Sequence, residues 1–179
     1  MMEPAARLAL AADIDAAARL KGSFKLRSGQ VSDEYFDKYR FEADPRLLAQ
    51  VAAAMAPLVP AGAQVLAGLE LGGVPIATAM SLATGTPAAF VRKKAKDYGT
   101  CLAVEGGSVQ GLKVVMIEDV ITTGGAVRDA ARLLAEAGAE VMGVVCAIWR
   151  GEGPPRIEGL DLPVWPALTR DDLNAARGG

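Results

Sequence analysis

Hydrophobic and polar positions divide this chain into two parts, and the pattern changes near residue 63. The alanine-rich first segment predicts a helix over residues 4–20, ended by Gly22. Residues 21–40 carry aromatic and β-branched side chains on both sides of a Ser-Gly turn, which indicates a β-hairpin. The pair Asp44-Pro45 combines a preferred N-cap with a preferred first helical residue, so a second helix is expected to about residue 55.

From residue 63 onward, hydrophobic residues form short, almost uninterrupted runs separated by glycine turns and helical segments. Strands that are buried on both faces of a parallel sheet have this composition. We therefore predict one α/β domain over residues 1–179, with a doubly wound, mainly parallel sheet flanked by helices. The strands are expected near residues 64–68, 87–91, 112–118, 140–149 and 164–168, and the helices near 73–84 and 126–137. Thr169 is expected to cap a last helical turn, with Asp172 at the capping-box position.

Size and composition fit a globular domain and narrow the classes of function. Of 179 residues, 51% are hydrophobic and 22% are charged, and the net charge of -2 gives no basic field for nucleic acid. No apolar run approaches the roughly 20 residues of a membrane span. The N-terminus lacks the basic start and unbroken apolar core of a signal peptide, so a cytoplasmic protein is expected.

Histidine is absent from the chain, and the two cysteines form no CxxC pair. The lack of imidazole excludes Ser-His-Asp and Cys-His triads and HExxH zinc sites. Cys146 lies in an apolar run and is expected in the core, whereas Cys101 lies in a polar stretch where exposure is expected. Any chemistry must therefore depend on carboxylates, lysines, arginines, hydroxyls or backbone groups.

The run VVMIEDVITTGG at residues 114–125 combines a buried strand with two adjacent acids and a Thr-Thr-Gly-Gly turn before a helix. Backbone N–H groups, hydroxyls and the helix dipole at such a turn can hold a phosphate. Glu118 and Asp119 could accept hydrogen bonds from vicinal hydroxyls, so the run suits a ribose 5-phosphate. The alternative is a strand end and a plain turn, but paired buried acids require partners.

This run resembles the signature of the type I phosphoribosyltransferases, which transfer ribosyl phosphate from 5-phosphoribosyl 1-diphosphate to a base. A second turn, LELGGVP, resembles the family's diphosphate loop, although taken alone it is equally a plain strand-to-helix turn. The resemblance implies that the phosphoribosyl diphosphate site comprises Glu70, Leu71, Gly72, Glu118, Asp119, Val120, Ile121, Thr122, Thr123, Gly124, Gly125 and Ala126.

The basic segment RKKAKDYG follows a predicted buried strand and runs into a loop of more than ten residues. A charge run is usually a solvated face, but a mobile basic lid would neutralise a diphosphate and exclude water. The segment resembles the lid of the orotate phosphoribosyltransferases, which places a flexible lid at about residues 94–109. The resemblance adds Arg92, Lys93, Lys96 and Tyr98 to the diphosphate site.

The hairpin also resembles the orotate phosphoribosyltransferases, where an N-terminal hood meets the base. The resemblance implies that orotate contacts Arg27, Tyr35, Phe36, Thr122 and Arg150. An aromatic face and cationic donors suit a planar anion. The alternative for Tyr35-Phe36 is a core pair. Two residues depart from the family pattern: Tyr98 replaces the usual histidine and cannot become cationic, and Arg27 replaces lysine.

The resemblance covers about residues 8–175 and implies a magnesium-dependent orotate phosphoribosyltransferase. Lys96, Glu118 and Asp119 are the expected catalytic residues, and Mg²⁺ is expected to bind mainly through substrate oxygens. The family also implies a homodimer in which Arg92, Lys96 and Tyr98 act on the partner's site. Two alternatives remain: a transferase for another base, such as a purine, and a non-catalytic regulator that senses phosphoribosyl diphosphate.

Overall fold

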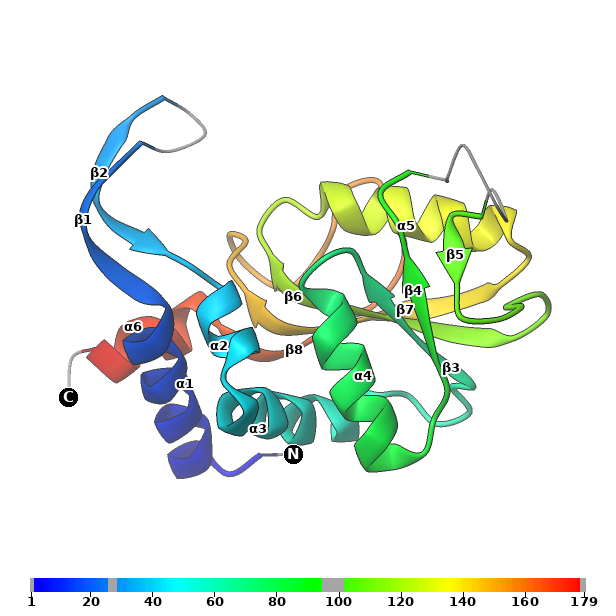
Figure 1. Ribbon diagram of the computed structural model, residues 1–179, viewed down its shortest axis with the longest axis horizontal. Helices are drawn as coiled ribbons and strands as arrows, with labels where there is room; N and C mark the ends of the chain where they lie inside the picture. Colours follow the sequence, from blue (N-terminus) through cyan, green and yellow to red (C-terminus); the bar gives the residue numbers. More distant parts are fainter. Residues whose placement is uncertain (1, 26–28, 95–101, 178–179) are drawn as a thin grey trace.

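A six-stranded sheet forms the centre of the computed structural model, which describes residues 2–25, 29–94 and 102–177 (Figure 1). The strands lie in the order β5-β4-β3-β6-β7-β8, and all neighbours are parallel except the β4–β5 pair. Their bounds are β3 (Val65–Leu69), β4 (Ala88–Val91), β5 (Val104–Glu105), β6 (Lys113–Ile121), β7 (Glu140–Trp149) and β8 (Val164–Thr169). The predicted mainly parallel α/β sheet is confirmed.

Helices cover both faces of this sheet, as Figure 1 shows. On one face lie α3 (Pro45–Met55), the 3-10 turn η1 (Ala56–Leu58) and α4 (Gly73–Thr84), and on the other lies α5 (Gly125–Glu136). Successive strand residues serve opposite faces: Ile117 packs with α3 and α4, whereas Met116 packs with α5. This two-sided burial explains why the central strands are hydrophobic at nearly every position.

The N-terminal segment builds a hood beside the sheet from α1 (Pro4–Ala18), β1 (Arg19–Lys25), β2 (Val31–Phe36) and α2 (Tyr39–Ala43). The antiparallel β1–β2 hairpin projects away from the sheet, and its base lies near α6 (Arg170–Arg177) (Figure 1). Two ends of the chain meet here, because the Arg7 guanidinium on α1 pairs with Asp172 on α6 at 2.7 Å.

Several predicted boundaries were wrong. Helix α1 ends at Ala18, and Gly22 lies within β1, where the register with β2 shifts, rather than ending the helix. The acids of β6 lie inside the strand, which continues to Ile121 rather than ending at residue 118. The last helix has eight residues instead of one turn. Helix α2 and strand β5 had no predicted counterpart, because both are too short to show a hydrophobic period.

Other local predictions were confirmed. Asp44 accepts hydrogen bonds from the first-turn N–H groups of α3, and Asp172 accepts from the N–H and hydroxyl of Thr169. Cys146 is fully buried on β7, and Cys101 lies outside the described residues.

Within residues 2–25, 29–94 and 102–177, no helix is long and apolar enough to cross a membrane.

Candidate active site

The paired acids lie near the carboxyl end of β6 and are both buried, with Asp119 fully inaccessible to solvent. The backbone N–H of Asp119 donates to Glu118 Oε1 at 3.0 Å, and the N–H of Val120 donates to Asp119 Oδ1. Desolvation and the neighbouring Asp119 raise the pKa of Glu118 well above its usual range. The pKa of Asp119 is lowered even though burial opposes this, because Glu118, Glu42 and Lys38 together stabilise its ionised form. The pKa values of the two acids are therefore shifted in opposite directions, with protonation favoured at Glu118 and ionisation at Asp119.

The predicted phosphate cradle follows the acids directly. A cavity of about 330 Å³ is lined by Glu118 and by every residue from Val120 to Val127. Helix α5 begins at Gly125, so its first N–H groups and its positive dipole end face this cavity. Gly124 adopts a left-handed backbone, and a Cβ at that position would lie 2.6 Å from Ile157. The structure thus gathers the residues predicted to hold the 5-phosphate.

The glycine loop after β3 lies against the same acids. A Cβ on Gly72 would overlap the Asp119 carboxylate, and one on Gly73 would overlap the carbonyl oxygen of Ile117. The backbone N–H of Lys93 donates to Glu70 Oε2 at 2.9 Å, which joins this loop to the end of β4. The peptide bond between Glu70 and Leu71 is cis.

A second cavity, of about 470 Å³, links this loop to the start of α5. Its lining includes Glu70, Arg92, Lys93, Gly125 and Ala126. Leu71 is 57% exposed. The predicted diphosphate residues Glu70, Arg92 and Lys93 therefore lie around one hollow that shares two residues with the phosphate cradle. Lys96 and Tyr98 lie outside the described residues.

The hood brings an aromatic ring against the arginine that follows β7. The Arg150 guanidinium carbon lies 5.1 Å from the centre of the Phe36 ring, and the backbone N–H of Arg150 donates to Ile121 O at 2.8 Å. Burial lowers the pKa of Arg150, and the nearby cations Arg19 and Arg170 lower it further. An anion bound here would offset that repulsion.

Tyr35 lies on the other face of β2 from Phe36, because successive strand residues alternate. Its ring contacts Phe24 at 5.6 Å between centroids and is 45% exposed. Phe36 is half-buried and packs against the core. The structure therefore brings Phe36, but not Tyr35, close to Arg150. Arg27 lies outside the described residues.

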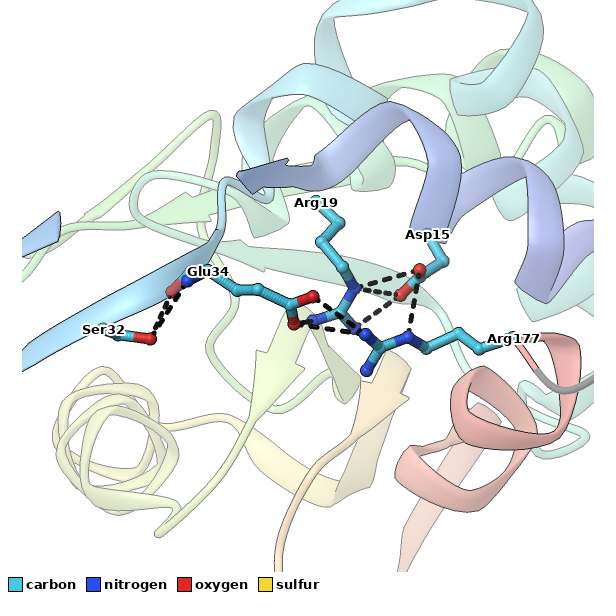
Figure 2. Close-up of polar contacts among 5 residues, drawn as sticks. All are labelled: Asp15, Arg19, Ser32, Glu34 and Arg177. Carbon is cyan, nitrogen blue, oxygen red and sulfur yellow. Dashed lines mark hydrogen bonds and ion pairs between the residues drawn. The ribbon is translucent and has the colours of Figure 1, made fainter. Parts of the chain in front are cut away.

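Four charged residues fix the base of the hood (Figure 2). Arg19 donates to Asp15 at 2.6 Å and to Glu34 at 2.9 Å, and Arg177 donates to Glu34 at 2.9 Å. This network joins α1, both hairpin strands and α6. The Arg19 guanidinium also lies 5.9 Å from the Phe36 ring centre, so the network holds the ring that faces Arg150.

Comparison with known proteins identifies the family. A family model described as a phosphoribosyl transferase domain matches residues 40–166. The chain is 63% identical over 171 residues to the orotate phosphoribosyltransferase of Nocardioides sp., covering 94% of each chain. This chain belongs to the orotate phosphoribosyltransferase family. The Pyrococcus horikoshii orotate phosphoribosyltransferase is 40% identical over 161 residues, with 88% of this chain and 87% of that protein covered.

Solved orotate phosphoribosyltransferases have the same fold. The Mycobacterium tuberculosis structure with Fe(III) dicitrate gives a TM-score of 0.83 at 33% identity, covering 94% of this chain and 98% of that one. The M. tuberculosis structure with 5-phospho-alpha-D-ribosyl 1-diphosphate gives a TM-score of 0.79 at 31% identity, covering 94% and 99%.

Two polar residues at this orotate phosphoribosyltransferase site were not predicted from the sequence. Lys38 Nζ lies 2.6 Å from Asp119 Oδ2, and the buried carboxyl of Glu42 contacts the same carboxylate. Lys38 lies at the end of residues 21–40, which were interpreted as a hairpin, and Glu42 lies between that segment and the helix expected from Asp44. The signal available in the sequence was a charged pair, Lys38 and Glu42, at helical i, i+4 spacing around the apolar Phe41.

Proposed function

We propose that this protein transfers ribosyl 5-phosphate from 5-phosphoribosyl 1-diphosphate to orotate, giving orotidine 5′-monophosphate and diphosphate. One observation carries the proposal: the phosphate cradle and the diphosphate-side cavity meet at the start of α5, beside the acids of β6. That layout matches a ribose with a phosphate at one end and a diphosphate at the other. The family relationship at 63% identity supports the same reaction.

We assign the roles of the residues from the family resemblance and from the cavities that they line. Residues 122–126 bind the 5-phosphate through backbone N–H groups and hydroxyls. The family resemblance assigns Asp119 to a ribose hydroxyl and to the cationic ribosyl centre, although its carboxylate is fully buried and Glu118 is the acid of β6 that lines the cavity. Glu118 lines the cradle and donates or accepts according to its proton.

The cationic side chains serve the two anions. Lys93 lines the diphosphate-side cavity, so its positive charge favours the departing diphosphate. Arg92 lines the same cavity, although the family resemblance assigns it to the partner's site. Arg150 and Phe36 offer a cation and a ring face to the planar orotate anion. Lys96 and Tyr98 are assigned to the diphosphate, and Arg27 and Tyr35 to orotate, by the family resemblance alone.

Magnesium is proposed as the cofactor, carried mainly by oxygens of phosphoribosyl diphosphate. Glu118 lines one cavity, and Glu70 and Asp129 line the other, so substrate oxygens and water would supply most of the oxygen ligands that Mg²⁺ requires. When bound, the ion neutralises diphosphate charge. The chain's own residues then orient the ribose and shield the reacting carbon.

A homodimer in the cytoplasm is part of the proposal. Arg92, Lys96 and Tyr98 would reach the partner's diphosphate, which makes each site dependent on two chains. The free, buried thiol of Cys146 is compatible with a reducing compartment.

Orotate depletion, followed by absorbance, tests the function directly. Consumption is expected only when both phosphoribosyl diphosphate and Mg²⁺ are present, and Asp119→Asn provides the matched inactive control. A panel of purine and pyrimidine bases tests the choice of base. Turnover of another base without orotate would contradict the base assignment, and no turnover of any base would contradict the transferase itself.

A further inference from the structure

Three acids share one buried region, and among the described residues a single lysine pairs with them there. Lys38 Nζ lies 2.6 Å from Asp119 Oδ2. Glu118 precedes Asp119 on β6, and the side chain of Glu42 approaches Asp119 from α2. A Cβ on Gly72 would overlap Asp119 and would lie 2.8 Å from Glu42 Oε1, so both carboxyl groups press against the same glycine. The family resemblance had assigned roles only to the two acids of β6.

The hydrogen-bonding of Glu42 indicates where a proton resides. Its Oε1 is fully buried, and no donor within the described residues reaches it. A carboxylate there would be desolvated and unsatisfied, beside a second carboxylate. A proton on Glu42 removes this conflict because it makes Glu42 a donor to Asp119. Consistently, burial and Asp119 raise the pKa of Glu42 to about 9.

We propose that Lys38 is a positioning residue that directs the negative charge of the three buried carboxyl groups to Asp119. The inference rests on the proposed function, in which an ionised Asp119 faces the ribose. Lys38 contacts Asp119 and not the reacting atoms. Its side chain is 34% accessible and stays partly hydrated, whereas the side chain of Asp119 is inaccessible to water. Glu42 supplies the complementary contact by donating its proton to the same carboxylate.

Other charged groups around Asp119 do not take over this task. Asp37 lies near Glu42 and adds negative charge, whereas Tyr39 lies beside Lys38, with its ring centre 5.4 Å from Nζ. Cys146, opposite Glu118 on β7, stays a neutral thiol because burial and the acids raise its pKa. Without Lys38, the negative charge would distribute over three acids, and Asp119 would become harder to ionise.

The test is the pH profile of kcat/KM for phosphoribosyl diphosphate in Lys38→Met, measured from about pH 6 to about pH 9. The acid limb is expected to move to higher pH, with activity below it reduced about tenfold for each pH unit that the limb moves, and recovered at alkaline pH. Lys38→Arg keeps the charge and is expected to restore the wild-type profile. Lys113→Met, on an exposed lysine at the far end of the same strand, is the matched control.

Glu42→Gln tests the second half of the inference without removing bulk. An amide can donate to Asp119 as a protonated carboxyl does, so wild-type activity is expected below about pH 9, whereas Glu42→Leu is expected to lose it. Equal loss of activity at all pH values in Lys38→Met would overturn the inference in favour of a purely structural ion pair. Loss in Glu42→Gln at neutral pH would overturn the proton assignment. An inactive wild-type protein would instead reject the proposed function.

Discussion

Asp119 shows how a single residue can be specified by partners that lie far away in the sequence. Its neighbours Lys38, Glu42 and Gly72 all precede it by more than 40 residues. The need for partners could be predicted, because two acids in an apolar strand cannot be buried alone. The partners themselves could not, because their segment forms only a five-residue helix with no measurable period.

Lys96 is the residue on which the family resemblance makes its most direct catalytic prediction. Lys96→Ala is expected to lower kcat by about a hundredfold, because one preorganised charge facing the leaving diphosphate is removed. Steady-state kinetics with saturating substrates measure the change, and Lys113→Ala serves as the control. A kcat near that of the wild type would remove Lys96 from this role.

At the scale of elements, a substitution in the loop between β3 and α4 tests whether the contact of this loop with the acids is required for stability. Gly72→Ala places a methyl group where the Asp119 carboxylate lies, so the free energy of unfolding is expected to fall by about 1–3 kcal/mol. Urea unfolding measures the loss. Gly125→Ala is the matched control for stability, since a Cβ there meets only the Arg128 side chain, at 3.8 Å. Equal stability of the two variants would show that the loop shifts freely.

A substitution in the hairpin tests whether the binding of orotate depends on the hood. Glu34→Gln weakens the links from Arg19 and Arg177 to β2, so Phe36 loses its fixed position near Arg150. We expect KM for orotate to rise severalfold, with kcat little changed. Glu136→Gln, which breaks an exposed pair on α5, is the control and is expected to change stability by under about 1 kcal/mol. An unchanged KM for orotate would separate the network from base binding.

Five of the six strands of the central sheet were predictable, because two-sided burial leaves a plain hydrophobic signal, whereas the order of the strands was not predicted. The hood was predictable in part: the hairpin was expected, but alternation along β2 separates Tyr35 from Phe36, and only the paired strand reveals which faces Arg150. The resemblance treated the two rings as one unit, whereas the backbone divides them.

For the whole molecule, the buried acids predict an unusual dependence of stability on pH. The pKa of Glu42 is about 9 in the folded protein and near 4.5 in the unfolded chain, so the folded state binds the extra proton between these values. Stability is therefore expected to fall as pH rises through this window, by at most about 1.4 kcal/mol per pH unit from this group.

Urea unfolding of the ligand-free protein across that window provides the measurement. Glu42→Gln should flatten the slope, because an amide does not titrate. Asp172 affects stability in the opposite direction and at lower pH. Hydrogen bonds from Arg7 and Thr169 outweigh the effect of burial and lower the pKa of Asp172, so its contribution to stability is lost as pH falls. A slope that is identical in wild type and Glu42→Gln would contradict the prediction.

Only one residue separates Phe36, which faces Arg150, from Lys38, which pairs with Asp119. A ligand that moves Phe36 is therefore expected to move Lys38, the counter-ion of Asp119, as well. We therefore expect residues 36–38 to carry a coupling free energy between the binding of orotate and that of phosphoribosyl diphosphate. Such coupling is reciprocal: if one substrate raises the affinity for the other by some factor, the second substrate raises the affinity for the first by the same factor.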